Sequence, residues 1–249
     1  MRYAILSDIH SNLEALEAVL AEAARSEAQE YLVLGDLVGY GADPAACLQR
    51  LRALSATIVA GNHDWACVGK VDAAYFNRYA RTALEWTRER LSFTDLAFLR
   101  SLRAKHEDRL VTLVHGTLRA PEKFDYLFDV AQVLETALIA KTPLCFVGHT
   151  HLPFIAEIDP RQPCVRRILH APEQCRHVAL DLERVKYVVN PGSVGQPRDG
   201  DPRASFAVLD TDGRWVDILR VPYDVAAAQR KIRDAGLPPV LADRLAVGQ

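Results

Sequence analysis

Five short apolar runs, each followed directly by polar residues that can bind a metal, constrain the fold of this chain most. They span residues 3–7, 31–34, 57–60, 110–114 and 144–147. Runs of four to eight mostly apolar residues that end at a glycine or a polar residue are typical of buried strands. Buried strands of an α/β sheet place functional groups just beyond their carboxyl ends. We therefore expect an α/β fold with a functional site along one sheet edge.

The residues that follow the five runs share the ability to ligate a metal, and they include five of the eight histidines. In chain order they are Asp8 and His10, Asp36, Asn62 and His63, His115, and His149 and His151. A single Asp after a strand is more often a helix cap or a turn former, so the repetition of the pattern gives it its weight. The two pairs spaced i, i+2 are expected to lie on extended backbone, with both side chains on one face.

Between the runs, apolar residues recur at helical spacing after Ser11-Asn12 and after Asp43-Pro44, which predicts two βαβ crossovers. The pattern is helical from 66 to about 105, with a new helix beginning near Ser92, and helical again over 130–139. These segments predict helices between the strands.

After His151 the sequence pattern changes to that of short strands separated by turns. Strands are expected at 153–158, 178–182, 187–190, 204–210 and 216–221. This pattern favours antiparallel hairpins that complete a second sheet. The stretch 159–177 contains three prolines and is expected to be an irregular insertion, and a helical tail is expected at about 223–245. With no linker or repeat between these parts, we expect one domain over residues 1–249.

Composition narrows the function classes. The formal net charge is −2 and the basic residues are scattered, so nucleic acid is not an expected partner. No apolar run approaches the ~18 residues of a membrane-spanning helix, and the first strand follows Met1 too closely for a secretion signal. Five cysteines without C-x-x-C spacing argue against a disulfide framework and a cysteine zinc site. We expect a cytoplasmic protein with free thiols.

Imidazole, carboxylate and amide ligands without sulfur suit Mn²⁺, Fe, Zn²⁺, Co²⁺ or Ni²⁺. Five ordered motifs carry them: Asp8-x-His10, Gly35-Asp36, Gly61-Asn62-His63-Asp64, His115 and Gly148-His149-x-His151. This set resembles the calcineurin-like metallophosphoesterases over about residues 3–151. Asn190-Pro-Gly-Ser193 extends the resemblance towards the small bacterial and archaeal phosphodiesterase branch.

The resemblance implies a four-layer αββα sandwich, with two mixed β-sheets flanked by helices, and a site for two divalent cations, with manganese expected first. It implies that Asp8, His10 and His151 bind one cation. It also implies that Asn62, His115 and His149 bind the other, with Asp36 bridging the two. His63 is expected to be the catalytic residue, as a general acid or as a donor to the phosphoryl oxygen. Asp64 has two interpretations: it orients His63, or it caps the helix that follows.

The sequence departs from the protein phosphatases of this family. Leu37-Val38-Gly39-Tyr40-Gly41 replaces the acid and arginine that follow their Gly-Asp motif, so no arginine clamp is evident. Arg119 and Arg198 are expected to be solvated surface charges. The loops expected to line a substrate pocket are 40–43, 66–79, 116–126 and 159–177.

We therefore expect an enzyme that hydrolyses phosphodiester bonds of a small-molecule substrate, with phosphomonoesters as the second substrate class. One alternative is a catalytically silent scaffold that binds protein partners; the presence of His63 and all seven ligands speaks against it. A protein or nucleotide phosphomonoesterase is the other alternative. A nuclease would need a basic groove, which the dispersed basic residues do not indicate. Strand edges left by the antiparallel hairpins could be covered by a second copy in a homodimer.

Overall fold

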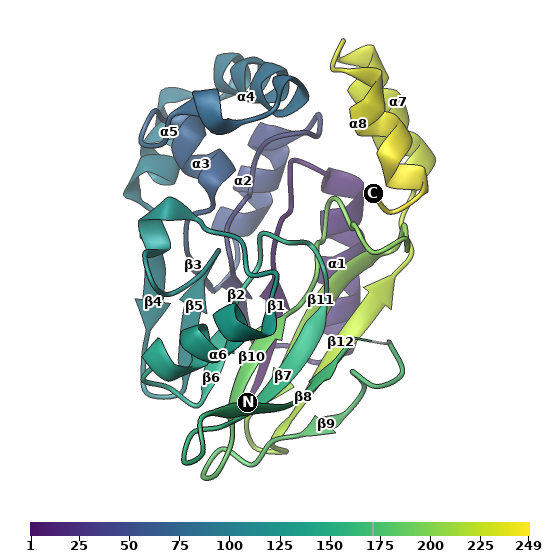
Figure 1. The fold of residues 1–249 in the computed structure, drawn as a ribbon. Helices are drawn as coiled ribbons and strands as arrows, with labels where there is room; N and C mark the ends of the chain where they lie inside the picture. The colour runs from purple at the N-terminus through teal and green to yellow at the C-terminus, as the bar shows by residue number, and fades with distance from the viewer. Residues whose placement is uncertain (171) are drawn as a thin grey trace.

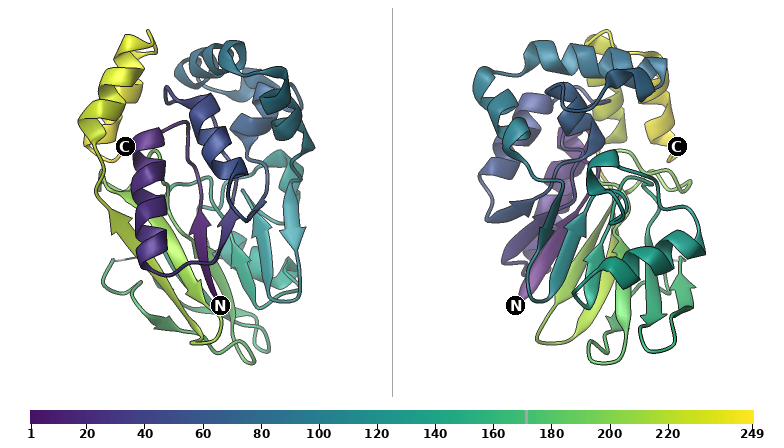
Figure 2. Two further views of the ribbon diagram at one scale, coloured as in Figure 1. Left: turned by 180° about the vertical axis from the view of Figure 1, so that it is seen from behind. Right: turned by 60° about the vertical axis from the view of Figure 1, so that its left-hand side comes forward.

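Two six-stranded sheets packed face to face, with helices on both outer faces, make up the protein (Figures 1 and 2). A computed structural model describes residues 1–170 and 172–249. The arrangement confirms the predicted four-layer fold of two mixed sheets flanked by helices.

The first sheet joins strands from both ends of the chain. Its order is β3 (Ala56–Ile58), β2 (Glu30–Val33), β1 (Arg2–Leu6), β11 (Ala204–Asp210), β12 (Trp215–Val221) and β9 (Val178–Ala179). Strands β1, β2 and β3 are parallel, as the two βαβ crossovers predict, and β11 pairs with β1 in antiparallel register. The amino-terminal and carboxyl-terminal parts of the chain are thereby joined in one sheet.

The second sheet is built from the middle of the chain. Its order is β4 (Lys105–Glu107), β5 (Val111–Val114), β6 (Leu144–Phe146), β10 (Lys186–Asn190), β7 (Phe154–Asp159) and β8 (Cys164–Leu169). Strands β5, β6 and β10 are parallel; β4 pairs antiparallel with β5, β7 pairs antiparallel with β10, and β8 pairs antiparallel with β7. All the parallel strands in both sheets end close to the candidate ligands.

The helices lie on the two outer faces and above the site. They are α1 (Leu13–Arg25), α2 (Pro44–Arg52), α3 (Asn62–Cys67), α4 (Arg78–Arg90), α5 (Phe93–Ser101), α6 (Val130–Ile139), α7 (Val225–Asp234) and α8 (Pro239–Asp243), with short 3₁₀ turns η1 (Ala73–Tyr75), η2 (Pro121–Lys123) and η3 (Arg244–Ala246). Helix α1 packs on β11 and β12, and α6 packs on β7, β8 and β10. Asn12 caps α1 and Ser92 forms the capping box of α5, as their sequences indicate.

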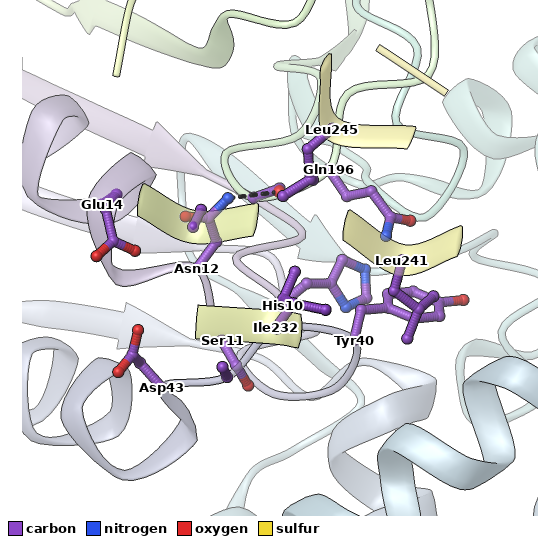
Figure 3. A pocket seen from close by; sticks show the side chains of 14 residues that line it. His10, Ser11, Asn12, Glu14, Tyr40, Asp43, Gln196, Ile232, Leu241 and Leu245 are labelled. Carbon is purple, nitrogen blue, oxygen red and sulfur yellow. Dashed lines mark hydrogen bonds between the residues drawn. The ribbon is translucent and has the colours of Figure 1, made fainter. Parts of the chain in front are cut away.

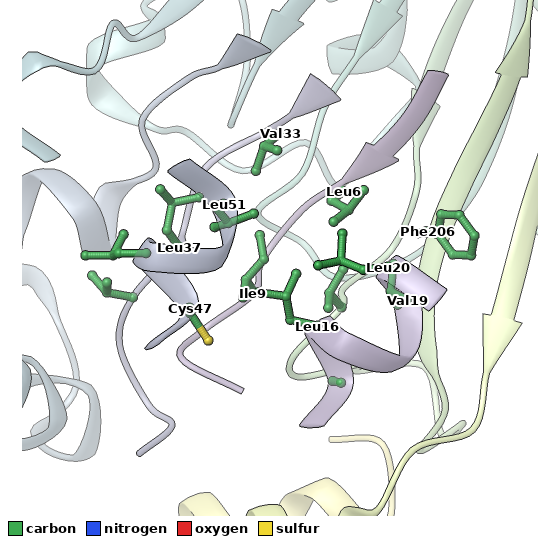
Figure 4. Packing of buried hydrophobic residues seen from close by; sticks show 14 of the residues in the cluster. Leu6, Ile9, Leu16, Val19, Leu20, Val33, Leu37, Cys47, Leu51 and Phe206 are labelled. Carbon is green, nitrogen blue, oxygen red and sulfur yellow. The ribbon is translucent and has the colours of Figure 1, made fainter. Parts of the chain in front are cut away.

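The three buried layers follow from the two-residue period of the strands. In β1, Ile5 points between the sheets, while Leu6 points towards α1 and packs in the cluster that Figure 4 shows. In β6, Phe146 likewise faces the first sheet and Cys145 faces α6. Strands buried on both faces read as continuous apolar runs, which is why these runs stand out in the sequence.

Three predictions about the elements were wrong. The stretch 159–177 contains strand β8, whose exposed Arg166 and Arg167 pair with acids of β7. The strands after His151 are divided between both sheets instead of completing one. Segment 66–105 is interrupted by turns and ends in strand β4. Each error concerns an edge strand or a long-range pairing, which local patterns do not specify.

The sequence predicts no membrane-spanning helix. Among residues 1–170 and 172–249, no helix has both the length and the apolar character needed to cross a bilayer.

Candidate metal centre

The candidate ligands lie where the carboxyl ends of the parallel strands meet. Backbone hydrogen bonds tie the loop after β1 to the loop after β2, among them those from Asp8 N to Gly35 O at 3.1 Å and from His10 N to Asp36 O at 2.9 Å. Between β5 and β6, the N–H of Gly148 donates to His115 O at 2.8 Å. These bonds bring ligands from distant parts of the chain to one place.

The backbone at the ligands differs from the extended conformation expected for the i, i+2 pairs. Asp8, His10, Asp36, His149 and His151 all have positive φ, between 48° and 66°. Non-glycine residues seldom adopt this left-handed conformation, and where they do the strain is usually found at functional sites. The side chains of each pair converge because of these turns, and not because of strand alternation.

One group of ligands comprises Asp8, His10 and His151. The Nε2 atoms of the two histidines are 3.2 Å apart, and Asp8 Oδ1 lies 3.2 Å from His151 Nε2. All three side chains are buried, and their ligand atoms lie close enough together to hold one ion.

A second group surrounds His115. Its Nε2 lies 3.1 Å from His149 Nδ1 and 3.2 Å from Asn62 Oδ1. Asp36 stands between the two groups, because its Oδ2 is 3.6 Å from His10 Nε2 and 3.3 Å from His115 Nε2. The structure therefore brings all seven predicted ligands together in two groups, with the Asp36 carboxylate between them.

The hydrogen bonds of His10 and His151 fit a cation. Their Nδ1 atoms face the carbonyl oxygens of Val38 at 3.3 Å and Gln196 at 2.5 Å, and a carbonyl only accepts, so Nδ1 carries the proton. Each Nε2 then presents a lone pair to the other. Asp8 Oδ1 is also buried without a hydrogen-bond donor among the described residues. A ring N–H held by a backbone carbonyl is the usual support of a metal-binding histidine.

The pKa values of the buried acids and histidines show how charge is distributed at the centre. Burial raises the pKa of Asp8 and of Asp36, but the neighbouring histidines outweigh it and hold both values below the usual range. Burial lowers the pKa of His115, yet the two carboxylates raise it to about 9. For His10 and His149 burial prevails and their pKa values fall. The two buried carboxylates and the neutral imidazoles of His10 and His149 form a donor set for cations.

His63 stands in the first turn of α3, next to the candidate ligand Asn62. Its backbone N–H donates to Asp36 Oδ1 at 2.9 Å. The centre of its ring lies 4.6 Å from that of the Tyr40 ring and 4.8 Å from that of the Phe76 ring. Its Nδ1 is buried without a partner in the described part of the chain, so Nε2 is the ring nitrogen left to face the cleft. Burial lowers the pKa of His63 to about 4.

The two interpretations of Asp64 are resolved in favour of the cap. Its carboxylate accepts hydrogen bonds from Gly61 N at 2.9 Å and from Leu37 N at 2.9 Å. Asp64 thus ties the loop that carries Asp36 to the start of α3, and its hydrogen bonds do not include the His63 ring.

Asn190 and Ser193 hold the ligand loops. Asn190 Nδ2 donates to Gly148 O and to Thr150 Oγ1, both at 3.0 Å. Ser193 Oγ donates to Asp8 O at 2.9 Å. Gly192 between them has φ of 79°, as a tight turn requires.

A cleft of about 390 Å³, here called the site cleft, opens beside the second group. Tyr40, Asn62, His63, Val71, Phe76, Asn77, Ala80, Lys123, Phe124, Tyr126 and His149 line it. Three of the four loops predicted to line a pocket contribute to it. The fourth, 159–177, supplies none of these residues. Sequence reasoning placed Tyr126 in a pocket-lining loop but did not predict that its ring stacks on His149 at 3.8 Å, because an aromatic residue in a loop gives no signal for such a contact.

The two arginines differ. Arg119 is exposed and pairs with Glu135, as expected. Arg198 is half-buried instead, donates to Gln196 Oε1 at 3.2 Å, and has a buried Nε with no hydrogen-bond partner among the described residues. Its charge contributes to lowering the pKa of His63, after burial. The expectation of a solvated surface charge was therefore wrong for Arg198.

The carboxyl-terminal segment packs close to His10. Leu241 and Leu245 line a cavity of about 10 Å³ together with His10 and Tyr40 (Figure 3). Asn12 Nδ2 donates to Gly195 O at 2.9 Å across the same region. A space of this size holds about one water molecule.

The sequence model of the calcineurin-like phosphoesterase superfamily domain matches residues 1–214 of the chain. The chain belongs to this family. A metallophosphoesterase from Sphaerobacter thermophilus has 41% identity to it and a TM-score of 0.86, over 100% of this chain and 99% of that one. An uncharacterized protein of Methanocaldococcus jannaschii, MJ0912, is 38% identical over 99% of this chain and 98% of its own length. Phosphodiesterase YfcE of Escherichia coli is 28% identical over 85% and 89%.

Family membership sets the class of reaction. The chain is a hydrolase of the calcineurin-like phosphoesterases, and it has groups of Asp and His side chains that could hold metal ions.

Proposed function

We propose that this protein hydrolyses a phosphodiester bond of a small-molecule substrate with the help of two divalent cations. The observation that carries the proposal is the pair of ligand groups joined by Asp36, whose Oδ2 lies within 3.6 Å of His10 Nε2 and 3.3 Å of His115 Nε2. One carboxylate oxygen between two sets of nitrogen ligands is the arrangement that a two-metal site needs.

Asp8, His10 and His151 hold one cation in this proposal. Asn62, His115 and His149 hold the other, and Asp36 contacts both. We expect manganese first, since the mixed nitrogen and oxygen ligands suit it as well as Fe, Zn, Co and Ni. Bound cations would stabilise the charge on the phosphoryl group and lower the pKa of a water nucleophile.

His63 is the proposed catalytic residue. Its low pKa, about 4, keeps the imidazole neutral at pH 7, so it has a single N–H to donate. With Nδ1 buried, we assign that proton to Nε2, facing the site cleft. A neutral donor fits a hydrogen bond to the phosphoryl oxygen better than full proton transfer to the leaving group.

The diester preference is supported by the name of the E. coli relative, phosphodiesterase YfcE, at 28% identity. A phosphomonoesterase remains the second candidate. A protein from Glaesserella parasuis, 27% identical over 75% of this chain and 64% of its own length, carries the name symmetrical bis(5'-nucleosyl)-tetraphosphatase. A silent scaffold is disfavoured because the ligand groups and His63 stand together around the cleft.

The test is hydrolysis of bis(p-nitrophenyl) phosphate and p-nitrophenyl phosphate by chelator-stripped protein before and after Mn²⁺ is restored. We expect turnover that needs the metal and prefers the diester, and that is lost in Asp36→Asn. Preference for the monoester would leave the site in place and replace the substrate class. Absence of metal-dependent turnover in protein shown to hold two metals would favour the scaffold.

A further inference from the structure

Two half-buried arginines, Arg198 and Arg244, have no role in the reaction proposed above. Arg198 lies in the loop between β10 and β11, and Arg244 begins η3, directly after α8. Arg244 lies beyond residues 1–214, the part of the chain that the family model matches. The two side chains are here called the arginine pair, and their surroundings indicate a binding site for an anion.

The segments that carry the arginine pair contact each other. Gly200 N donates to Gly248 O at 3.0 Å, which ties the loop between β10 and β11 to the residues after η3. Gln196 and Leu245 line the same small cavity beside the metal centre (Figure 3). Arg198 Nη2 donates to Gln196 Oε1 at 3.2 Å. Tertiary packing therefore brings the two arginines to one place, although they are far apart in the sequence.

The charges of the arginine pair act on the metal centre and on a wall of the site cleft. Burial lowers the pKa of His63 and of His151, and the charge of Arg198 lowers both further. Burial raises the pKa of Tyr40, and the charges of both arginines oppose this increase. Tyr40 lines the site cleft, and its ring centre lies 4.6 Å from that of His63. The pair therefore lies within electrostatic reach of the site.

Within residues 1–170 and 172–249, neither arginine of the pair is ion-paired with an acidic side chain. The acids close to them in the sequence pair with other arginines: Asp199 with Arg220, Asp201 with Arg203, and Asp243 with Arg233. Arg198 Nε is buried without a hydrogen-bond partner in this part of the chain. Arg244 Nε donates to Gln249 O at 2.6 Å, which leaves its two terminal nitrogens for another acceptor.

Two like charges that are partly removed from water and lack an acidic partner raise the free energy of the folded protein. The pKa of Arg244 reflects this cost, because burial lowers it and the charge of Arg198 lowers it further. A bound anion would offset the cost. Guanidinium groups bind phosphate and carboxylate through paired N–H bonds. Two guanidinium groups match the double charge of a phosphate better than the single charge of a carboxylate.

We propose that the arginine pair binds a second phosphate group of the substrate while the scissile phosphoryl group occupies the metal centre. Tyr40 connects the two places, because its ring packs against His10 and His63 at the centre and lines the site cleft. This inference rests on the proposed function and adds a substrate class to it: phosphodiesters whose retained group carries a second phosphate.

The test uses diesters that all release p-nitrophenol and retain an alkyl chain of two, three or four methylene groups. The chain ends in a phosphonate, a carboxylate or a methyl group, so at each length the esters differ only in the terminal group. The measured quantity is the ratio of kcat/KM for each charged ester to that for the methyl-terminated ester of the same length. A ratio is insensitive to a general loss of activity in a variant.

Wild type is compared with Arg198→Gln, Arg244→Gln and Arg119→Gln. Arg119 is the matched control because it is exposed, pairs with Glu135, and lines neither the site cleft nor the small cavity. Arg198 also contacts Gln196, whose carbonyl accepts from the His151 ring. Arg244→Gln therefore decides the question if Arg198→Gln does not fold.

We expect the wild-type ratio for the phosphonate ester to reach roughly tenfold at one chain length or more, the scale of one hydrogen bond to a charged group. Each substitution in the arginine pair should lower that ratio roughly tenfold, and Arg119→Gln should leave it within about twofold. A wild-type ratio near one at all three lengths, or a ratio that both substitutions leave unchanged, would overturn the proposal. A carboxylate ratio as high as the phosphonate ratio would replace the second phosphate by a carboxylate.

A binding measurement separates this inference from the proposed function. Titration calorimetry of the Mn²⁺-loaded protein compares alkane diphosphonates with alkylphosphonates of the same chain lengths, none of which contains an ester bond to hydrolyse. Direct chelation of Mn²⁺ by a diphosphonate affects every variant equally. Binding of the diphosphonate that is roughly tenfold tighter, and that loses this advantage in Arg244→Gln but not in Arg119→Gln, supports the arginine pair even if no diester is hydrolysed. Equal binding of the two compounds, or an advantage that Arg244→Gln preserves, refutes it.

Discussion

At the scale of single residues, the centre is defined by which atoms are left without partners. His10 and His151 give their Nδ1 protons to backbone carbonyls, and Asp8 keeps a buried oxygen that no described donor reaches. A buried carboxylate oxygen without a partner is costly, because desolvation is not compensated. Cations at this place would compensate it, so the same residues that destabilise the metal-free site are those proposed to bind metal.

Replacement of His63 by Asn should lower kcat by about 10²–10³-fold, the range for losing one donor to a phosphoryl or oxyanion oxygen. Because burial lowers the pKa of His63 to about 4, we expect a donor role and therefore the same loss for phenyl and p-nitrophenyl leaving groups. The measurement is steady-state hydrolysis of matched diesters, with metal content determined by elemental analysis.

The metal content of that variant should remain that of the wild type, since all seven candidate ligands are unchanged. A loss that grows with the pKa of the leaving group would instead make His63 the general acid. Loss of metal from the variant would instead assign the His63 side chain a structural role beside Asp36, because the bond from the backbone N–H of His63 to Asp36 Oδ1 is kept in the variant.

The thiols offer a second prediction at this scale. Burial raises the pKa of Cys67 and Cys145 to about 12 and that of Cys175 to about 11, and raises the pKa of Cys47 as well. Cys164 in β8 is the exposed cysteine. We expect one thiol per native chain to react rapidly with a disulfide reagent at pH 8, because only a thiolate attacks.

All five thiols should react once the protein is unfolded in denaturant. Cys164→Ser should remove the rapid phase in the native protein. Two or more rapid thiols in the native protein would contradict the burial of the other four.

At the scale of elements, the sequence predicts the strands that are buried on both faces and misses β4 and β8, the two edge strands of the second sheet. The runs that become β1, β2, β5 and β6 are mostly apolar because both of their faces are covered, which makes them recognisable in the sequence. Strand β8 lies at a sheet edge, and its exposed arginines hide any alternation. The pairing of β11 with β1 joins residues about 200 positions apart, which no local pattern encodes.

The candidate site was predictable for a related reason. Its ligands follow the visible strands at fixed short spacings, so the motifs survive in the sequence even though the backbone conformation at Asp8 and His149 was not foreseen. Tyr126 and Arg198 were not predictable in the same way. They come from loops whose course depends on tertiary packing, and neither forms part of a repeated pattern.

The carboxyl-terminal helices give a prediction for an element. Leu241 of α8 is 1% exposed and packs in the cluster that also holds Tyr40, whereas its neighbour Val240 is 40% exposed. We expect Leu241→Ala to lower the free energy of unfolding by about 2–5 kcal/mol, through lost burial and a residual cavity. Val240→Ala, the matched control, should change it by less than about 1 kcal/mol. Urea unfolding followed by circular dichroism measures both.

An equal effect of the two substitutions would show that α8 does not pack as described. A change in unfolding slope instead of midpoint would show that the helices unfold separately from the sheets.

At the scale of the whole molecule, two sheets bring six parallel strand ends to one edge, and each sheet supplies part of each ligand group. Asp8, His10, Asp36 and Asn62 follow strands of the first sheet, and His115, His149 and His151 follow strands of the second. The cluster therefore exists only when the sheets are packed together. Binding of cations that contact both sheets should stabilise the packed state by mass action.

The central claim is that two cations bind per chain, with Asp36 between them. The most direct measurement is equilibrium dialysis of chelator-stripped protein against Mn²⁺, with bound metal determined by elemental analysis and compared between wild type and Asp36→Asn. The account predicts two Mn²⁺ per wild-type chain at saturation, and weaker binding at both sites in the variant. Saturation at one ion per chain, or binding that Asp36→Asn leaves unchanged, would contradict it.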